Sequence, residues 1–359
     1  QPAGGVSGAG GVATGTLSST VAESKTVSAT IGGVGITQTA TVVVNPGAPN
    51  NLNFVVQPTS AISGASIAPA IQVEVRDALN NRVTTAANQV SLAFANNAGG
   101  GTLTGGAATT PVSGVATFSG VSIDKAGTGY TLSATATGVT GITSSAFNIT
   151  AGAVSASQST VSASSPITAS SGSSQSTITV TAKDANGNVI SGATVVLGAS
   201  GSNNTLSASG ATNSSGVYSG TLSSTTAESK TVSATINGVA ITQTAAVTVN
   251  AGAATQLVFT SQPTNAVQGS AFNPVVVVTA EDAFGNTDLN FTGSVQMTIA
   301  TDPGVASSLN GTNPVTAVAG VATFNGLNIT TLSGGNGYKL GASSGALTAT
   351  SAAFNITLL

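Results

Sequence analysis

Eighteen residues of this chain occur twice in almost the same form, and this repeat constrains the fold more than any other feature. ESKTVSATIGGVGITQTA occupies residues 23–40, and ESKTVSATINGVAITQTA occupies residues 228–245, 205 positions later. Other segments match at the same offset, such as LNFVVQP at 52–58 with LVFTSQP at 257–263. Repetition at a long, nearly fixed period predicts an array of similar structural units.

Two unlike kinds of unit alternate along the chain, and we call them type A and type B. Residues 152–251 form a complete type-A unit, whereas 48–151 and 252–359 form two type-B units. Residues 1–47 match only the second half of type A, so we predict that they are the C-terminal half of a truncated type-A unit. On this interpretation the chain is a window onto a longer alternating array.

Short alternating segments predict an all-β fold. In STITVTAKDANGN at 176–188, Ile178, Val180 and Ala182 would face one side of a strand, and threonines would face the other. Clusters of Gly, Asn, Asp and Pro supply turn signals about every 8–12 residues, and no segment has a helical period with caps. About seven short strands in each unit of about 100 residues predict tandem immunoglobulin-like β-sandwich domains in a linear array.

Two tyrosines are expected to have a structural role in the type-B units. GTGY at 127–130 and GNGY at 335–338 place Tyr130 and Tyr338 just before predicted strands. This position suits a tyrosine corner, in which the hydroxyl donates a hydrogen bond to the backbone a few residues upstream. An ordinary half-buried tyrosine explains the pattern equally well.

The composition excludes several classes of function. The chain contains no cysteine, histidine or tryptophan, so thiolate and imidazole metal sites and Cys–His or Ser–His nucleophile pairs are impossible. A net charge of −3 and only seven scattered Lys and Arg residues argue against nucleic-acid partners. No apolar stretch approaches the ~20 residues of a transmembrane helix, so no membrane span is expected in this segment.

Acidic turns are the candidate structural and cation-binding positions. The stretches RDALNN, KDANGN and EDAFGN place Asp77, Asp184 and Asp282 at equivalent sites. An Asx-type turn, whose carboxylate accepts backbone N–H groups, is the favoured interpretation, and oxygen ligation of Ca²⁺ is the alternative. The weak calcium candidates lie in the second type-B unit and are Glu281, Asp282, Asp288 and Asp302. No other cofactor is expected.

No catalytic residues are predicted, and we expect that the chain is not an enzyme. Paired carboxylates can hydrolyse glycosides when they converge on one cleft. Glu281 and Asp282 are adjacent, however, and adjacent residues of a strand point to opposite faces. The Ser- and Thr-rich edges predicted for these sandwiches offer no such cleft.

Part of the chain resembles a known family of repeats. VTAKDANGNVISGATVVL at 180–197, followed by GVYSGTLSSTTAESKTVSATING, resembles the bacterial immunoglobulin-like repeats of the invasin and intimin type. The resemblance covers type A and its half copy, and the KDANGN turn and TVSAT strand are its most specific parts. Type B is similar to another bacterial immunoglobulin-like repeat of large secreted and surface proteins. The resemblance implies extracellular or cell-surface stalk modules of the adhesin kind, without the terminal domain that binds receptors in the invasin group.

Two functions therefore remain open at the level of sequence. The first is a non-enzymatic stalk or spacer of a long bacterial surface protein. The second is a self-assembling subunit of an extracellular filament, sheath or surface layer, because only 5% of the residues are charged and surface charge normally keeps β proteins apart. Neighbouring copies of the same repeat array are the expected partners, by lateral self-assembly in the second case.

Overall fold

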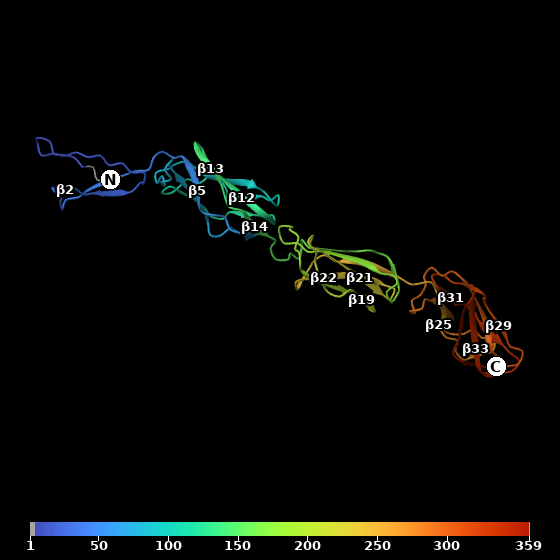
Figure 1. Cartoon of the computed structure of the whole chain (residues 1–359). Coiled ribbons are helices and arrows are strands. Elements are labelled where there is room, and N and C mark those ends of the chain that lie inside the picture. The colour runs from blue at the N-terminus through green and yellow to red at the C-terminus, as the bar shows by residue number, and fades with distance from the viewer. Residues whose placement is uncertain (1–3, 359) are drawn as a thin grey trace. The chain divides into compact units, whose positions relative to one another are not determined.

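The computed structural model describes residues 4–358, and every regular element in that range is a β-strand (Figure 1). The predicted all-β, immunoglobulin-like class is confirmed. The described residues divide into two compact units. One contains residues 4–153 and 183–188, and the other contains 154–182 and 189–358. No helix long and apolar enough to cross a membrane occurs among residues 4–358.

The N-terminal segment, residues 4–47, contains only two small antiparallel pairs of strands. Its strands are β1 (Ser24–Val27), β2 (Thr30–Ile31), β3 (Val34–Gly35) and β4 (Ala40–Val43). Ser24 of β1 lies opposite Val43 of β4. The repeated sequence in the type-A unit pairs Ser229 with Thr248, which is the same register 205 residues later. The repeat therefore preserves strand pairing as well as sequence.

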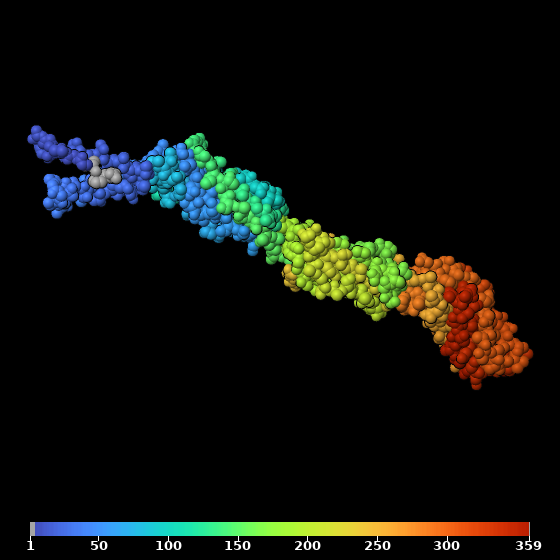
Figure 2. Space-filling model, in the orientation of Figure 1, coloured from blue at the N-terminus to red at the C-terminus, as the bar shows by residue number. Residues whose placement is uncertain are grey.

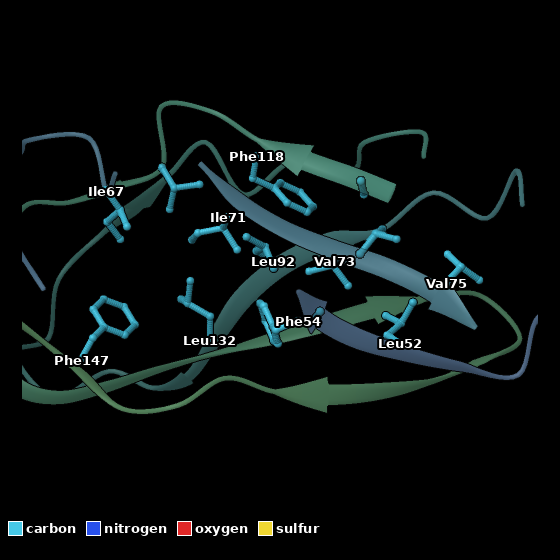
Figure 3. Packing of buried hydrophobic residues seen from close by; sticks show 14 of the residues in the cluster. Leu52, Phe54, Ile67, Ile71, Val73, Val75, Leu92, Phe118, Leu132 and Phe147 are labelled. Atoms are coloured by element: carbon cyan, nitrogen blue, oxygen red, sulfur yellow. The ribbon is translucent and has the colours of Figure 1, made fainter. Parts of the chain in front are cut away.

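The first type-B unit has an eight-stranded sheet in the order β10-β7-β5-β13-β12-β14-β6, with β8 paired to β12, and a two-stranded sheet, β11-β9. Its strands are β5 (Asn51–Val56), β6 (Ala61–Ile62), β7 (Ile71–Arg76), β8 (Ser91–Asn96), β9 (Leu103–Thr104), β10 (Val115–Phe118), β11 (Ser122–Ile123), β12 (Gly127–Ala136), β13 (Val139–Thr143) and β14 (Phe147–Thr150). Phe54, Val73 and Leu132 point into the space between the strands (Figure 3). Alternate residues of β12 are buried, as a period-two strand requires, whereas in β7 the ion-paired Glu74 is buried together with Val73 and Val75.

The type-A unit has a four-stranded sheet, β15-β17-β21-β19, and a second sheet in the order β16-β24-β22-β18-β20, with β23 paired to β22. The strands are β15 (Thr160–Ala163), β16 (Ile167–Thr168), β17 (Ser176–Thr181), β18 (Thr194–Ala199), β19 (Asn204–Leu206), β20 (Gly210–Ala211), β21 (Val217–Ser224), β22 (Ser229–Ile236), β23 (Val239–Ala240) and β24 (Ala245–Asn250). Ile178, Val180 and Ala182 are fully buried, as the alternation predicted.

The second type-B unit repeats the first with small insertions. Its strands are β25 (Gln256–Ser261), β26 (Ala266–Val267), β27 (Val276–Glu281), β28 (Ser294–Thr301), β29 (Ser308–Asn310), β30 (Val315–Thr316), β31 (Val321–Phe324), β32 (Asn328–Thr330), β33 (Gly335–Ser344), β34 (Leu347–Thr350) and β35 (Phe354–Thr357). The β25–β27 pair has the register and the bulge of β5–β7. The stretch ALTATSAAFNIT at 346–357 is divided between β34 and β35, which pair with different parts of β33.

The two predicted tyrosine corners differ in detail. Both tyrosines are fully buried and lie inside strands β12 and β33 rather than before them. The Tyr130 hydroxyl donates to the backbone oxygen of Lys125, five residues upstream, at 2.8 Å, which is the hydrogen bond of a tyrosine corner. Tyr338 instead bonds to the Ser307 hydroxyl at 2.9 Å. The equivalent backbone oxygen, that of Ser333, already accepts the Thr331 hydroxyl at 2.7 Å.

Candidate functional site at the domain junctions

Asp77 closes the turn after β7 and also holds the linker that precedes the first type-B unit. Its Oδ1 accepts the backbone N–H groups of Leu79 and Asn81, each at 2.9 Å. Its Oδ2 accepts the Asn81 amide at 2.9 Å and the backbone N–H of Gly47 at 2.8 Å. One carboxylate therefore fixes both an Asx-type turn and a linker residue thirty positions earlier.

The Asn81 side chain continues from this turn to the N-terminal segment. Its Oδ1 accepts the backbone N–H of Ala22 at 2.9 Å, and its Nδ2 donates to the backbone oxygen of Thr20 at 3.0 Å. Both ends of the amide therefore bond to the backbone just before β1 of the N-terminal segment. An amide can do this because it carries a donor and an acceptor side by side.

Asp184 makes the same set of contacts at the next turn of this kind, KDANGN. Its Oδ1 accepts the backbone N–H groups of Asn186 at 2.9 Å and Asn188 at 2.8 Å. Its Oδ2 accepts the Gly152 backbone N–H at 2.8 Å, the Ser63 hydroxyl at 2.6 Å and the Asn188 amide at 2.9 Å. The whole turn, 183–188, belongs to the compact unit that contains the first type-B sandwich.

The Asn188 amide binds that sandwich as Asn81 binds the N-terminal segment. Its Oδ1 accepts the backbone N–H of Ala126, and its Nδ2 donates to the backbone oxygen of Asp124, both at 2.9 Å. Lys125 lies between these two residues and donates from Nζ to the backbone oxygen of Asn186 at 2.6 Å. The Lys125 bond and the bonds of the Ser63 hydroxyl to Asp184 and Asn186 have no counterpart at the other two described turns.

Asp282 forms the third example, in the second type-B unit. Its Oδ1 accepts the backbone N–H groups of Phe284 and Asn286. Its Oδ2 accepts the backbone N–H of Gly252 and the side-chain amide of Asn286. All four distances are 2.9 Å. Asn286 then accepts the Ala227 backbone N–H at 2.8 Å and donates to the Thr225 backbone oxygen at 2.9 Å. Both partners belong to the type-A unit.

We call this repeated arrangement the junction clasp. Each clasp consists of a turn aspartate, a linker glycine and the asparagine four residues after the aspartate: Asp77, Gly47 and Asn81; Asp184, Gly152 and Asn188; Asp282, Gly252 and Asn286. The glycine contributes its N–H group rather than unusual backbone angles. A Cβ added to Gly47 or Gly252 would be in ordinary contact with the aspartate.

The clasp carboxylates are buried and stay ionised. All three aspartates are at most 3% exposed. The Asn81 amide and the Gly47 N–H lower the pKa of Asp77 to about 2. Burial by itself raises the pKa of Asp184, but the Gly152 N–H and the Ser63 hydroxyl outweigh it and bring the pKa to about 2. The pKa of Asp282 is lowered in the same way, against the effect of burial.

At each of the three aspartates, Oδ1 accepts two backbone N–H groups of the following residues, which is the arrangement of an Asx-type turn. The linker glycines and the clasp asparagines were not identified from the sequence. The signal available was the recurrence of Asn at the last position of RDALNN, KDANGN and EDAFGN. Its partners on the preceding unit lie 59 to 64 residues away in the chain, so spacing alone did not reveal them.

The four calcium candidates are engaged in separate interactions. Asp288 accepts the Ala254 backbone N–H at 2.9 Å and so adds a second restraint to the third linker. Asp302 accepts the Gly304 N–H and the Ser307 hydroxyl, and Glu281 accepts the Gln256 amide. Within residues 4–358, no group of three or more acidic side chains is placed to hold a metal ion. Calcium binding stays the untested alternative to the Asx-type turn, and the Asp282 oxygens already accept four N–H groups.

Open grooves accompany the first and third clasps. One, of about 440 Å³, is lined by Asn45, Asp77 and Asn81 among others, and the other, of about 540 Å³, is lined by Glu228, Asn250 and Asn286 among others. Each contains one carboxylate, and the remaining polar groups are amides, hydroxyls and backbone.

Lys230 is a buried cation that the sequence analysis did not single out. Its side chain is fully buried, and Nζ donates to the Ser202 backbone oxygen at 2.7 Å and pairs with Glu228. Glu228 also accepts the Ser202 N–H at 3.0 Å. The signal was present in the alternation of KTVSATI: Lys230 lies two residues before Val232, and residues at this spacing share one face of a strand.

Residues 155–252 match the family model described as invasin, domain 3. This range corresponds to the type-A unit, on which the resemblance to invasin and intimin repeats was recognised. The match extends over roughly a quarter of the chain. A comparison with curated protein sequences gave no significant match.

Solved structures that resemble this chain include the following three. The Escherichia coli adhesin FdeC has 20% identity, with 88% of this chain and 99% of that chain covered and a TM-score of 0.43. Yersinia pseudotuberculosis InvD is 19% identical, the match covers 85% of this chain and 96% of InvD, and the TM-score is 0.42. Invasin, described as a bacterial integrin-binding protein, is 19% identical to this chain. The match covers 86% of this chain and 60% of the invasin chain, and the TM-score is 0.39.

Proposed function

We propose that the chain is a load-bearing stalk or spacer segment of an extracellular or cell-surface protein, without enzymatic activity. The observation that carries the proposal is the junction clasp, which recurs at three turns with the same residue types. A polypeptide that only needed to connect independent domains would gain nothing from a buried, multiply bonded carboxylate on every linker. The clasps limit bending where tandem sandwiches are otherwise free to hinge.

The proposed location at the cell surface has two grounds. The match of residues 155–252 to an invasin domain supports a bacterial cell-surface protein of the adhesin kind. The absence of cysteine is compatible with that location, because the clasps and cores do not depend on disulfides. Receptor binding is not part of the proposal, since the clasp residues bond to the chain itself.

Small-angle X-ray scattering of the full chain tests the stalk. The proposal predicts that Asp282→Ala and Gly252→Pro broaden the interatomic distance distribution and increase the flexibility of the particle. The matched control is Gly252→Ala, which keeps the N–H donor and should scatter as the parent protein does. Equal flexibility of the parent and all three variants would overturn the proposal.

Lateral self-assembly remains a second candidate because of the low charge. Sedimentation velocity over a wide concentration range, followed by negative-stain electron microscopy, separates the two. Discrete particles at all concentrations support the stalk. Ordered sheets or bundles of chains side by side would make assembly the function instead.

A further inference from the structure

The only two arginines of the chain, Arg76 and Arg82, lie side by side on the first type-B unit. Arg76 is the last residue of β7 and forms an isolated antiparallel bridge with Arg82. Both guanidinium groups bind one carboxylate: Arg76 pairs with Oε1 of Glu74, and Arg82 Nε donates to Oε2 at 2.8 Å. The turn at 77–81 therefore brings together two cations that stand apart in the sequence. We call Glu74, Arg76 and Arg82 the arginine triad.

The arginine triad has hydrogen-bond donors that the protein itself does not use. Burial by itself raises the pKa of Glu74, but the bonds from Arg82 and Arg76 outweigh it and lower the pKa. Arg82 bonds only through Nε, so the N–H groups on its two Nη atoms have no partner within residues 4–358. The Arg82 side chain is 48% exposed. One ionised carboxylate and two guanidinium groups leave the triad with one positive charge in excess.

Side-chain amides surround the triad on the same face of the sheet. Asn53 of β5 lies opposite Glu74, and Asn51 lies opposite Arg76. Gln72 precedes Glu74 by two residues on β7 and therefore shares its face. All three amide residues are partly buried, and their side chains make no hydrogen bond to another group within residues 4–358. The face therefore presents free amide groups beside guanidinium donors.

The second type-B unit shows that the fold does not require the triad. The residues at its three positions, 205 further along the chain, are Thr279, Glu281 and Thr287. Strands β25 and β27 pair in the register of β5 and β7, and Glu281 forms the same isolated bridge with Thr287. The sheet is thus built equally well without either arginine, which leaves the triad without a structural necessity.

We propose that the arginine triad and its three amides bind an acidic polysaccharide that carries carboxylate groups. A guanidinium fork matches a planar carboxylate through two parallel N–H···O bonds. The amides of Asn51, Asn53 and Gln72 can both donate to and accept from sugar hydroxyl groups, which an acidic peptide offers only sparsely. Figure 2 shows the blue-to-green surface of this unit as closely packed, without a deep cleft on the side in view. An extended polysaccharide needs no enclosed pocket.

The site is separate from the junction clasp, so the proposal does not depend on the stalk function. The nearest clasp carboxylate is that of Asp77, and its oxygens already accept the Gly47, Leu79 and Asn81 donors. It does not compete for the free Nη groups of Arg82. Loss of binding and loss of junction stiffness are therefore independent outcomes.

NMR titration of the isotope-labelled full chain with oligosaccharides of hyaluronan and of polygalacturonate, both carboxylated, tests the proposal. At low ionic strength, where surface charges are least screened, we expect saturable amide shifts at Asn51, Gln72 and Arg82. Their counterparts in the second type-B unit, Gln256, Val277 and Thr287, should not shift. Neutral dextran should leave all of these signals unchanged.

Substitutions at the exposed arginine separate recognition from simple charge. Arg82→Gln should weaken binding at least about tenfold, because it removes a charged donor. Arg82→Lys keeps the charge but not the fork and should also weaken binding several-fold. Lys339→Gln is the matched control, since it removes one exposed positive charge from the second type-B unit and should bind as the parent does.

Four results would overturn the proposal. The first is the absence of shifts with both carboxylated oligosaccharides. The second is equal binding by Arg82→Lys and the parent, and the third is tighter binding of dextran sulfate than of hyaluronan, since both would indicate attraction by charge alone. The fourth is binding of polyglutamate at the triad without binding of either oligosaccharide, which would assign the site to an acidic peptide.

Discussion

The Asp282 carboxylate accepts a hydrogen bond at 2.9 Å from the backbone N–H of Gly252, thirty residues earlier in the chain. Gly252 belongs to the linker after the type-A unit, and Asp282 belongs to the turn after β27. The same relationship joins Asp77 to Gly47 and Asp184 to Gly152, each at 2.8 Å. The linker is therefore part of the hydrogen-bonded structure of the following turn.

Removing the acceptor should open the third linker locally. In Asp282→Ala, the Gly252 N–H loses a charged partner, and its amide should exchange at least about tenfold faster, since such bonds are worth about 1.5–3 kcal/mol. Native-state hydrogen exchange of the full chain measures this. Asp302→Ala is the control, because Asp302 is exposed and bonds only near its own loop. Equal protection at Gly252 in both variants would show that the clasp contributes nothing.

Glycine at the linker should be replaceable by alanine but not by proline. The Cβ of Gly252→Ala would lie 3.4 Å from the Asp282 Cβ, which is a tolerable contact. Gly252→Pro removes the N–H donor and should uncouple the linker as strongly as Asp282→Ala does. Amide exchange at Phe284 and Asn286 reports the outcome. The opposite order, with alanine more disruptive than proline, would mean that space rather than the hydrogen bond is decisive.

The clasp at Asp184 should persist well into the acid range. Its pKa of about 2 in the folded protein lies below that of an unfolded aspartate, about 3.9. Its contribution to stability is therefore fully present above about pH 4 and is lost as the pH falls through about 2. Urea unfolding of the parent and Asp184→Asn should show a stability difference that is constant from pH 7 to 5 and narrows below pH 4. A difference that disappears between pH 7 and 5 would contradict the assignment.

Alanine substitutions at the equivalent glycines Gly99 and Gly304 should respond differently to removal of the neighbouring tyrosine hydroxyl. A Cβ at Gly304 would meet the hydroxyl oxygens of Tyr338, Thr331 and Ser307, whereas a Cβ at Gly99 would also meet the backbone oxygen of Ala126 at 2.4 Å. Both alanine variants should lose about 1–3 kcal/mol through overpacking. Tyr338→Phe should relieve much of the loss in Gly304→Ala, and Tyr130→Phe little of that in Gly99→Ala. Denaturant titrations of the single and double variants compare the two cases, and equal rescue would contradict the geometry.

Calcium should leave the protein unchanged. The Asp282 oxygens are occupied by N–H donors, and the other candidates are not brought together. We expect Tm to change by less than about 1 °C between EDTA and about 5 mM Ca²⁺, which would saturate even a weak extracellular site. A rise of several degrees that Asp288→Asn abolishes would establish a calcium site instead.

The sequence was sufficient for the fold because its signals are local. Alternation at Ile178 and Val180 and the repeated turns determine strands and their faces without tertiary information. The Asx-type turns at Asp77, Asp184 and Asp282 were predictable for the same reason. The bond from the Gly47 N–H to Asp77 and the bonds of Asn81 to Thr20 and Ala22 join residues that are far apart in the sequence. The spacing of residues along the chain does not predict such contacts.

The positions of Lys230 and the Tyr338 hydroxyl also depend on tertiary contacts that local sequence patterns do not contain. Lys230 could have been placed in the core by its parity with Val232, but its burial depends on the Ser202 loop. The hydroxyl of Tyr338 was expected to follow that of Tyr130. Its expected backbone partner is taken by Thr331, a competition that only the folded loop reveals.

The central claim is that the clasps restrain the junctions, and distance measurements between spin labels test it most directly. The chain has no cysteine, so Thr231→Cys in the type-A unit and Thr323→Cys in the second type-B unit, both exposed positions, give one defined label pair. Double electron–electron resonance should give a single narrow distance distribution in the parent and in Gly252→Ala. The distribution should become broad in Gly252→Pro and Asp282→Ala. A broad distribution in the parent protein, unchanged by these substitutions, would contradict the account.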